Sequence, residues 1–267
     1  MTPIIPVLAD GTITLTEHLS PQLRVLLDEV GQLAARAHWP SYAVGGCVRD
    51  WLLGRPVNDV DLVIEGDGII IAQQFAQAHR TQLTTHVQFK TATVLVPLAS
   101  FARRKRSSKQ LTETLRLDFA TCRKEIYAKP AAYPKVSAGT LQDDLFRRDV
   151  TINAMAMRLS PTPFGRLIDL FHGYEDLRAR LIRVLHPQSF RDDPSRILRA
   201  IRFAERLHCT IEPQTATWMR RALHDNLLAR LNRGRLRKEL LAILHEPEPL
   251  RCLRTLSEWL LSAQGPA

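Results

Sequence analysis

The feature that most constrains the fold of this chain is a change in its hydrophobic pattern near Gly173. Before Gly173, strand-like runs at 42–44 and 57–64 alternate with helical stretches. After Gly173 strand signals largely vanish, and the spacing is helical at 190–208, 213–229 and 233–244. This order predicts an α+β protein, with a small mixed sheet and flanking helices followed by an all-helical part.

The expected division follows this change of pattern. Residues 1–20 are expected to form an N-terminal extension, 21–172 a mixed domain and 173–267 a helical domain. A length of 267 residues fits two modest domains. Further elements expected in the mixed domain are strands at 91–98, 114–120 and 166–170, helices over 69–79 and 141–159, and a loop at 128–139.

The charge balance favours a polyanionic partner. The chain has 37 Lys and Arg against 27 Asp and Glu, a formal net charge of +10. A basic enzyme that binds no polyanion would have the same composition, so the charge alone leaves both alternatives open.

The expected location is the cytoplasm, with no membrane partner. The four cysteines are far apart and form no C-x-x-C pair, which is typical of reduced thiols. No apolar run approaches the ~18 residues of a spanning helix, and the N-terminus does not resemble a signal peptide.

The densest chemical signal lies in residues 42–67. Gly45 and Gly46 follow an expected strand and precede an expected helix, where backbone N–H groups can approach a phosphate. Arg49 lies one turn into that helix and is expected to reach the same phosphates. The segment matches neither the P-loop nor the G-x-G-x-x-G pattern.

Two carboxylates follow on the next expected strand. Asp59 and Asp61 are two residues apart, so both side chains project from one face. Such a pair repels unless a cation lies between them, and Mg²⁺ holding nucleotide phosphates is the natural occupant. An isolated pair of this kind is most often solvated at the surface, but the upstream glycines and arginine favour the metal.

The string GGCVRDWLLGRPVNDVDLVIEGD resembles the signature of the class II tRNA nucleotidyltransferase and poly(A) polymerase family, within the polymerase-β-like superfamily. The resemblance covers residues 25–245. It implies a nucleotidyltransferase head followed by a helical neck and body, Mg²⁺ bound by Asp59 and Asp61, and ATP or CTP as substrates. The family usually continues into a longer helical tail, so the body is expected to be truncated here.

A third carboxylate lies in the string LRLDFA. Asp118 on that expected strand could face Asp59 and Asp61 across a sheet. Its expected catalytic role is to accept the proton of the attacking 3′-OH or to complete the metal site. An edge-strand aspartate with no such role explains the pattern equally well.

Two later strings resemble further family motifs. RRDVTINAMAM, at 147–157, implies that Arg148 and Asn153 hold the triphosphate and sugar, although two arginines at a helix end could also be a solvated face. In FRDDPSRILRAIRFAERL, at 190–207, the family's E-D-x-x-R motif has Asp in place of Glu at its first position. By default, the basic stripe there is an exposed face of an amphipathic helix.

The resemblance assigns base reading to Asp193 and Arg196, and contacts with the nucleotide or acceptor RNA to Arg199 and Arg202. A carboxylate accepts from the exocyclic amino group of A or C, and a guanidinium donates to the neighbouring ring nitrogen. U and G present the opposite pattern, and each buried mismatch costs ~1–3 kcal/mol. The pair is therefore expected to admit ATP and CTP without a template.

Two weaker sequence patterns are each consistent with two interpretations. Arg235 and Glu239, at helical spacing i, i+4, are either a surface ion pair or a support for the base-reading helix. The basic run 103–109 is either a solvated loop or a source of phosphate contacts.

These observations predict a Mg²⁺-dependent enzyme that adds AMP and/or CMP to the 3′ end of tRNA and releases pyrophosphate. The open alternatives are a poly(A) polymerase acting on other RNAs, a small-molecule adenylyltransferase on the same head, and a non-catalytic RNA-binding module. Neither the nucleotides that are added nor the oligomeric state is specified by the pattern.

Overall fold

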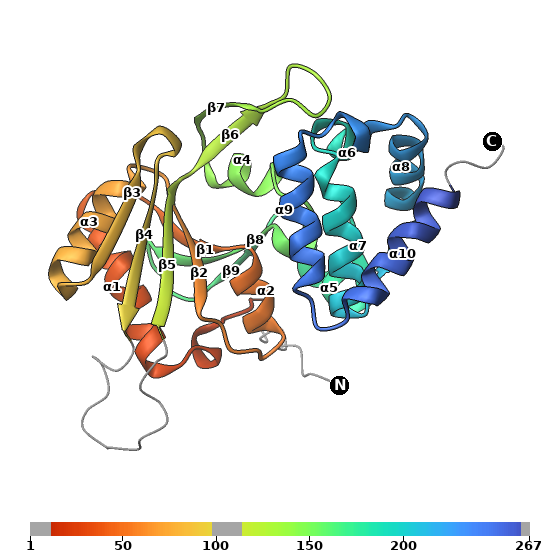
Figure 1. The fold of residues 1–267 in the computed structure, drawn as a ribbon. Coiled ribbons are helices and arrows are strands. Elements are labelled where there is room, and N and C mark those ends of the chain that lie inside the picture. The colour runs from red at the N-terminus through yellow and green to blue at the C-terminus, as the bar shows by residue number, and fades with distance from the viewer. Residues whose placement is uncertain (1–11, 98–113, 263–267) are drawn as a thin grey trace. The chain divides into compact units, whose positions relative to one another are not determined.

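The computed structural model describes residues 12–97 and 114–262, and it divides into two compact units (Figure 1). Within these ranges, the first unit holds the chain up to Lys124 together with Ala138–Leu145 and Asn153–Leu170. The second unit holds Glu125–Ser137, Phe146–Ile152 and the chain from Phe171. The expected α+β fold, a mixed sheet with helices, is confirmed. The basic run 103–109 lies outside the described residues.

A seven-stranded sheet forms the centre of the described part of the first unit, in the order β3-β4-β5-β2-β1-β8-β9. Strands β2 and β5 are parallel, and the pairs β1–β2, β1–β8, β3–β4, β4–β5 and β8–β9 are antiparallel. The strands are β1 (Ser41–Val44), β2 (Asp59–Ile64), β3 (Gln82–His86), β4 (Thr91–Pro97), β5 (Thr114–Thr121), β8 (Met155–Ser160) and β9 (Leu167–Asp169).

Helices α1 and α3 pack on the same side of this sheet (Figure 1). Ser20 caps α1 by accepting a hydrogen bond from the Leu23 backbone N–H, and the ring of Phe75 on α3 lies 6.1 Å from that of Phe119 on β5. The helices are α1 (Pro21–Arg36), α2 (Gly46–Leu52), α3 (Gly68–His79) and α4 (Leu141–Phe146), with 3-10 turns η1 (Thr16–His18), η2 (Val87–Phe89) and η4 (Thr151–Asn153).

The prediction of one helix over 141–159 was wrong. The chain forms the short helix α4, the turn η4 and then strand β8, whose residues are almost all buried. A strand that is buried on both faces loses the alternation that separates it from a helix, so periodicity alone could not identify β8.

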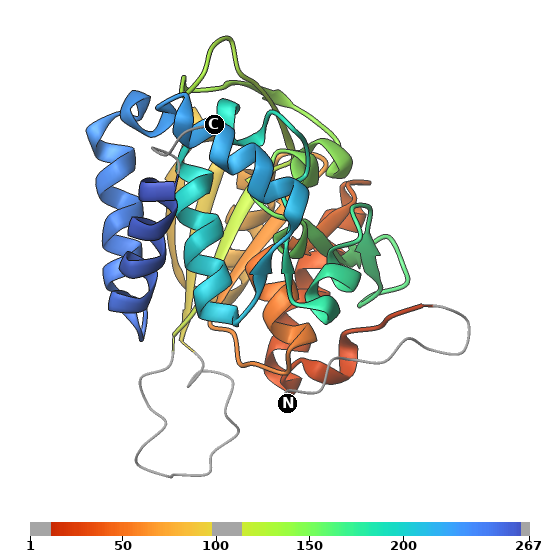
Figure 2. The same ribbon diagram turned by 90° about the vertical axis from the view of Figure 1, so that its right-hand side faces the viewer.

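The second unit is mainly helical, and α7, α9 and α10 pack against one another (Figure 2). Its elements are α5 (Gly173–Ala179), β10 (Leu181–Ile182), α6 (Ser189–Asp192), α7 (Ser195–Leu207), β11 (Thr210–Ile211), α8 (Pro213–His224), η5 (Leu227–Arg230), α9 (Arg233–Leu244) and α10 (Pro249–Ser262). Residues 125–137 of this unit are called the arm below. The arm includes parts of a two-stranded sheet of β6 (Arg123–Ile126) and β7 (Lys135–Ala138), and β7 lies where a loop was expected.

The expected helix over 190–208 is broken into α6 and α7. Asp193 between them is extended, with φ of −136°, because the residue before a proline disfavours helical geometry. The expected helix over 213–229 ends at His224, since Asn226 takes a left-handed conformation with φ of 52°.

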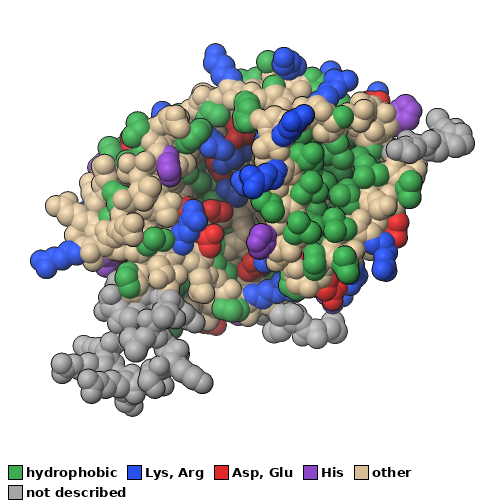
Figure 3. Space-filling model, in the orientation of Figure 1, with side chains coloured by type: hydrophobic (Ala, Val, Ile, Leu, Met, Phe, Trp, Pro, Cys, Tyr) green, Lys and Arg blue, Asp and Glu red, His purple; other side chains and the backbone are tan. Residues whose placement is uncertain are grey.

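Apolar side chains gather at the surface over α7 to α10 of the second unit (Figure 3). Leu244, Leu250 and Leu261 are among the exposed large residues there. In the described part of the chain, no helix is both long enough and apolar enough to cross a membrane.

A close approach of α1 to the sheet depends on Gly31. A Cβ atom built on Gly31 would lie 2.6 Å from the backbone oxygen of Leu159 on β8. Backbone cannot move aside as a flexible side chain can, so this position requires the absence of a side chain.

We therefore expect Gly31→Ala to destabilise the chain by ~1–3 kcal/mol, because overpacking outweighs the helix propensity that alanine adds. Thermal or urea unfolding measures the change. Gly234→Ala in α9 is the control, because its added Cβ would meet nothing closer than 3.5 Å. Equal stabilities of the Gly31 variant and the natural chain would contradict the packing argument.

Candidate active site

Three aspartates predicted to act together lie on one face of the sheet in the first unit. In the parallel pairing of β2 with β5, Asp61 is opposite Asp118 and Asp59 is opposite Arg116. The intervening residues Val60 and Leu117 are fully buried on the opposite face. Alternation therefore turns the apolar side chains into the core and the carboxylates outward.

Arg116 is a member of this cluster that the sequence interpretation missed. Its Nε lies 2.9 Å from Asp118 Oδ2 and 3.8 Å from Asp59 Oδ1. Thr93 on β4 donates a hydrogen bond of 2.5 Å to Asp118 Oδ1. The i, i+2 spacing of Arg116 and Asp118 on an expected strand was the signal that could have identified it.

The carboxylates are close enough to perturb one another. Burial, and then the charge of Asp118, raise the pKa of Asp59 above its usual value, while Arg116 opposes the shift. Oxygen donors crowded in this way suit a hard divalent cation, so the residues fit such an ion chemically. Within residues 12–97 and 114–262, however, no group of three or more acidic, His or Cys side chains has a geometry ready for a metal.

The glycine turn and the second motif meet in the first unit. Gly45 precedes α2 with φ of 84°, a conformation that favours glycine, and its N–H donates to the Met155 carbonyl. Gly46 begins α2. Arg49 is 3% exposed, and its Nη1 donates a 2.5 Å hydrogen bond to Asn153 Oδ1. Two of the residues predicted to hold the nucleotide, 104 positions apart, are thus in direct contact.

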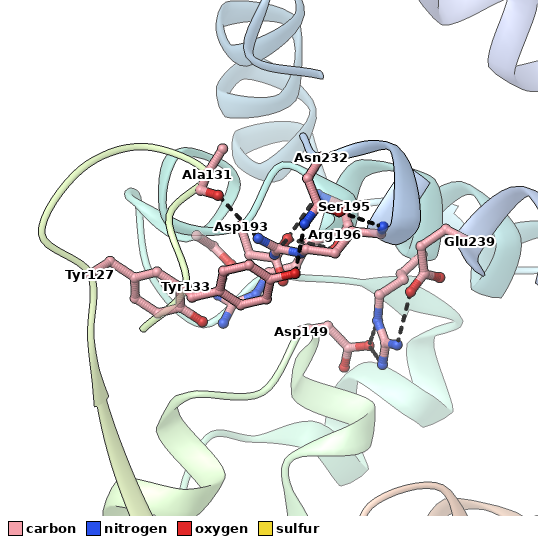
Figure 4. A network of polar contacts seen from close by, with 12 residues as sticks. Tyr127, Ala131, Tyr133, Asp149, Asp193, Ser195, Arg196, Asn232 and Glu239 are labelled. Atoms are coloured by element: carbon pink, nitrogen blue, oxygen red, sulfur yellow. Dashed lines mark hydrogen bonds and ion pairs between the residues drawn. The ribbon is translucent and has the colours of Figure 1, made fainter. Parts of the chain in front are cut away.

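The residues predicted to read the base lie at the break between α6 and α7 (Figure 4). Asp193 occupies the extended position, and Arg196 lies in the first turn of α7 and is 4% exposed. Arg196 donates from Nη1 to Ser189 Oγ and from Nη2 to the Arg147 carbonyl, at 2.7 and 2.6 Å. Since a guanidinium has five N–H donors, these contacts fix its plane without using all of them.

The remaining arginines of α7 are paired with carboxylates rather than forming an exposed basic stripe. Arg199 contacts Asp149 through Nε at 2.7 Å and Nη2 at 2.5 Å, and Asp149 is the largest cause of its raised pKa. Arg202 pairs with Glu246 at 2.8 Å. Arg148 is half-buried in the turn that follows α4. None of these contacts tests a role in nucleotide binding, which stays a prediction.

Arg235 and Glu239 do not form the i, i+4 pair considered from the sequence. Arg235 forms an ion pair with Asp193, and Glu239 lies 3.7 Å from Arg199 Nη1. Arg235 and Glu239 thus contact Asp193 and Arg199, two residues of the same unit that are predicted to bind the nucleotide.

Comparison with known proteins identifies the family. Residues 41–183 match the family described as the poly A polymerase head domain. The chain belongs to this family. Residues 209–264 also match a family described as a probable RNA and SrmB binding site of polymerase A. Nucleotidyltransferases of the head-domain family generally use a divalent metal.

Similar proteins extend well beyond the matched part. An A-adding tRNA nucleotidyltransferase of Geobacter sulfurreducens is 38% identical over 243 residues, which make up 91% of this chain and 26% of that protein. A CCA-adding enzyme structure superposes with a TM-score of 0.82 at 39% identity, covering 93% of this chain and 55% of the other. A tRNA nucleotidyltransferase complexed with a primer tRNA and an ATP analogue has a TM-score of 0.73 at 39% identity, covering 87% and 60%.

A half-buried histidine, His186, lies close to Asp192 in the second unit. His186 stacks on Phe146 with ring centroids 4.9 Å apart, and its Nε2 is 3.9 Å from Asp192 Oδ2. Burial, and then the charge of Arg196, lower the pKa of His186 from 6.5 to about 4. Protonation therefore favours the unfolded chain. The stabilising contribution is complete above pH 6.5 and is lost as the pH falls toward 4.

We expect His186→Gln to reduce the loss of stability between pH 7 and pH 4.5 by ~2 kcal/mol, the linkage expected for this pKa difference. Urea unfolding at the two pH values measures it. His224→Gln, at an exposed histidine, is the control and should keep the natural pH dependence. A His186 variant with the same pH dependence as the natural chain would exclude this linkage.

Proposed function

We propose that this chain is a template-independent RNA 3′-terminal nucleotidyltransferase, which adds AMP and/or CMP to the 3′ end of tRNA and releases pyrophosphate. The observation that carries the proposal is the register of β2 with β5, which brings Asp59, Asp61 and Asp118 to one face. Membership of the head-domain family supports it, as do relatives named for adding A to tRNA. The formal net charge of +10 suits an RNA acceptor.

Mg²⁺ is the proposed ion, with Asp59 and Asp61 as its ligands. When bound, it would polarise the α-phosphate and neutralise charge on the departing pyrophosphate. Asp118 would take up the proton of the RNA 3′-OH or complete the metal site. Arg116 lies between Asp118 and Asp59, so it would have to turn away from one of them when the ion enters.

The triphosphate is proposed to lie along the glycine turn. Gly45 and Gly46 have no side chains to obstruct a phosphate there, and Arg49 would contribute positive charge. Asn153 holds the guanidinium of Arg49, so it would orient that charge as well as contact the sugar. Arg148 is proposed to contribute a further phosphate contact.

Base selection is proposed to depend on Asp193 and Arg196. The carboxylate would accept from the amino group of adenine or cytosine, and the guanidinium would donate to the ring nitrogen beside it. Arg199 and Arg202 could contact nucleotide or RNA phosphate only by exchanging their present partners Asp149 and Glu246.

The proposal predicts incorporation of AMP into tRNA that lacks only its final A, in the presence of ATP and Mg²⁺. Two further acceptors, tRNA lacking the whole CCA and complete tRNA, each supplied with CTP or ATP, would show whether CMP is added as well. The products are resolved on a sequencing gel. Failure to extend all three acceptors in the presence of Mg²⁺ would rule out the proposed activity.

Asp59→Asn and Asp61→Asn should each reduce incorporation at least ~100-fold, because each removes a charged oxygen donor from the proposed metal site. The bound tRNA fraction, measured by filter binding, should stay unchanged. Asp28→Asn, which changes an exposed aspartate of α1, is the matched control. Full activity of the Asp59 and Asp61 variants would instead favour a mechanism that does not use this face.

A further inference from the structure

Only one oxygen of the Asp193 carboxylate, which is proposed to read the base, accepts hydrogen bonds from described residues. Asp193 Oδ1 accepts from the Ser195 backbone N–H at 2.9 Å and from Ser195 Oγ at 2.5 Å, and it also forms an ion pair with Arg235. Among the residues that the structure describes, none donates a hydrogen bond to the other oxygen, Oδ2. The two oxygens of one carboxylate are therefore not equivalent.

Arg235 connects this carboxylate to the arm. Its Nη1 donates to the carbonyl of Ala131 at 3.1 Å, and its guanidinium carbon lies 5.7 Å from the ring centroid of Tyr133. The side chain of Arg235 is only 18% exposed, so these contacts hold it in place. A single guanidinium thus contacts Asp193, Ala131 and Tyr133.

Further hydrogen bonds beside Arg235 join the arm to α9 and to the turn before α7 (Figure 4). Asn232 caps α9, with its Oδ1 accepting from the Arg235 backbone N–H at 2.8 Å, and its Nδ2 donates to the Tyr133 hydroxyl at 2.6 Å. The backbone N–H of Ala131 donates to the carbonyl of Arg191, two residues before Asp193. These bonds all lie within the second unit, and they link the arm, α9 and the turn that carries Asp193.

We propose that Arg235, held in place by Tyr133 and the carbonyl of Ala131, is a positioning residue that presents only Oδ2 of Asp193 to the nucleobase. It would thereby enforce the choice of a base with an amino group over one with a carbonyl group at the same position. The inference rests on the proposed function, because it assumes that Asp193 reads the base.

The chemistry follows from the limited rotation of an anchored carboxylate. The terminal torsion of aspartate is broad, so an unanchored carboxylate can rotate away from a base that offers an acceptor. Three donors on Oδ1 stop this rotation and leave one acceptor in a fixed direction. An amino group of adenine donates to it, whereas a carbonyl oxygen at that position meets it acceptor to acceptor. Lysine could not replace Arg235 fully, since arginine forms these contacts with a planar fork of donors.

The test compares ATP with inosine triphosphate, which has a carbonyl where adenine has its amino group. The variants are Arg235→Gln, Arg235→Lys and Tyr133→Phe, the last of which removes only the hydroxyl that Asn232 contacts. Arg237→Gln, an exposed arginine of the same helix, is the matched control for loss of one charge. Two ratios are measured for the full chain: kcat/KM with ATP over inosine triphosphate, and the corresponding ratio of equilibrium dissociation constants.

We expect Arg235→Gln to lower both ratios at least about ten-fold, the size of a lost charged hydrogen bond. Arg235→Lys should recover part of this selectivity, Tyr133→Phe should lower both ratios about two-fold or more, and Arg237→Gln should leave them unchanged. An Arg235→Gln variant that loses activity equally with both nucleotides would overturn the inference, because a purely structural role predicts that result. Unchanged ratios in Tyr133→Phe would also contradict it.

Asp193→Asn separates this inference from the function on which it rests. If Asp193→Asn abolishes selectivity while Arg235→Gln retains it, the carboxylate reads the base without help from Arg235, and only the inference fails. If Asp193→Asn leaves selectivity intact, the assignment of base reading fails, and the inference fails with it. If the natural chain incorporates no nucleotide at all, the proposed activity fails, whereas the binding ratios still decide the role of Arg235.

Discussion

The parallel pairing of β2 with β5 is the constraint on which the arrangement of the first unit depends. One register places Val60 beside Leu117 in the core and Asp61 beside Asp118 on the opposite face. Because the period of a strand is two residues, a slip by one position would bury the acidic side chains and expose the apolar ones. Core packing and carboxylate placement are therefore selected together, and burial of the core keeps the acidic cluster in place.

Much of the first unit could be predicted because its signals are local. The cap at Ser20, the alternation of β2 and the glycine turn each depend on residues a few positions apart. Strand β8 could not be predicted in the same way, since burial on both faces removes its periodicity. Arg116 was overlooked although its spacing from Asp118 was visible, because a cation among proposed metal ligands runs against simple charge reasoning.

The second unit shows where local patterns stop being informative. The helical spacing of Arg199 and Arg202 is by default typical of an exposed basic stripe, but both side chains are paired with carboxylates 50 and 44 positions away. The contact of Arg235 with Ala131 spans 104 positions. The periodicity of a single helix carries no information about partners so far away in the chain. The sequence could therefore indicate which arginines lie on one face of α7, but not which carboxylates pair with them.

The interleaving of the two units along the chain has a consequence for dissecting the protein. A fragment that begins at Phe171 would contain α7 and α9 but would lack the pieces at 125–137 and 146–152. Arg199 would then lose Asp149, Arg196 would lose the carbonyl of Arg147, and Arg235 would lose that of Ala131. Each guanidinium would keep only one of these partners, Ser189 for Arg196, Glu239 for Arg199 and Asp193 for Arg235, and would lose the contacts that the two missing pieces supply. The second unit therefore cannot be obtained intact by truncating the chain at one position. A fragment that reproduces it would also have to include residues 125–137 and 146–152.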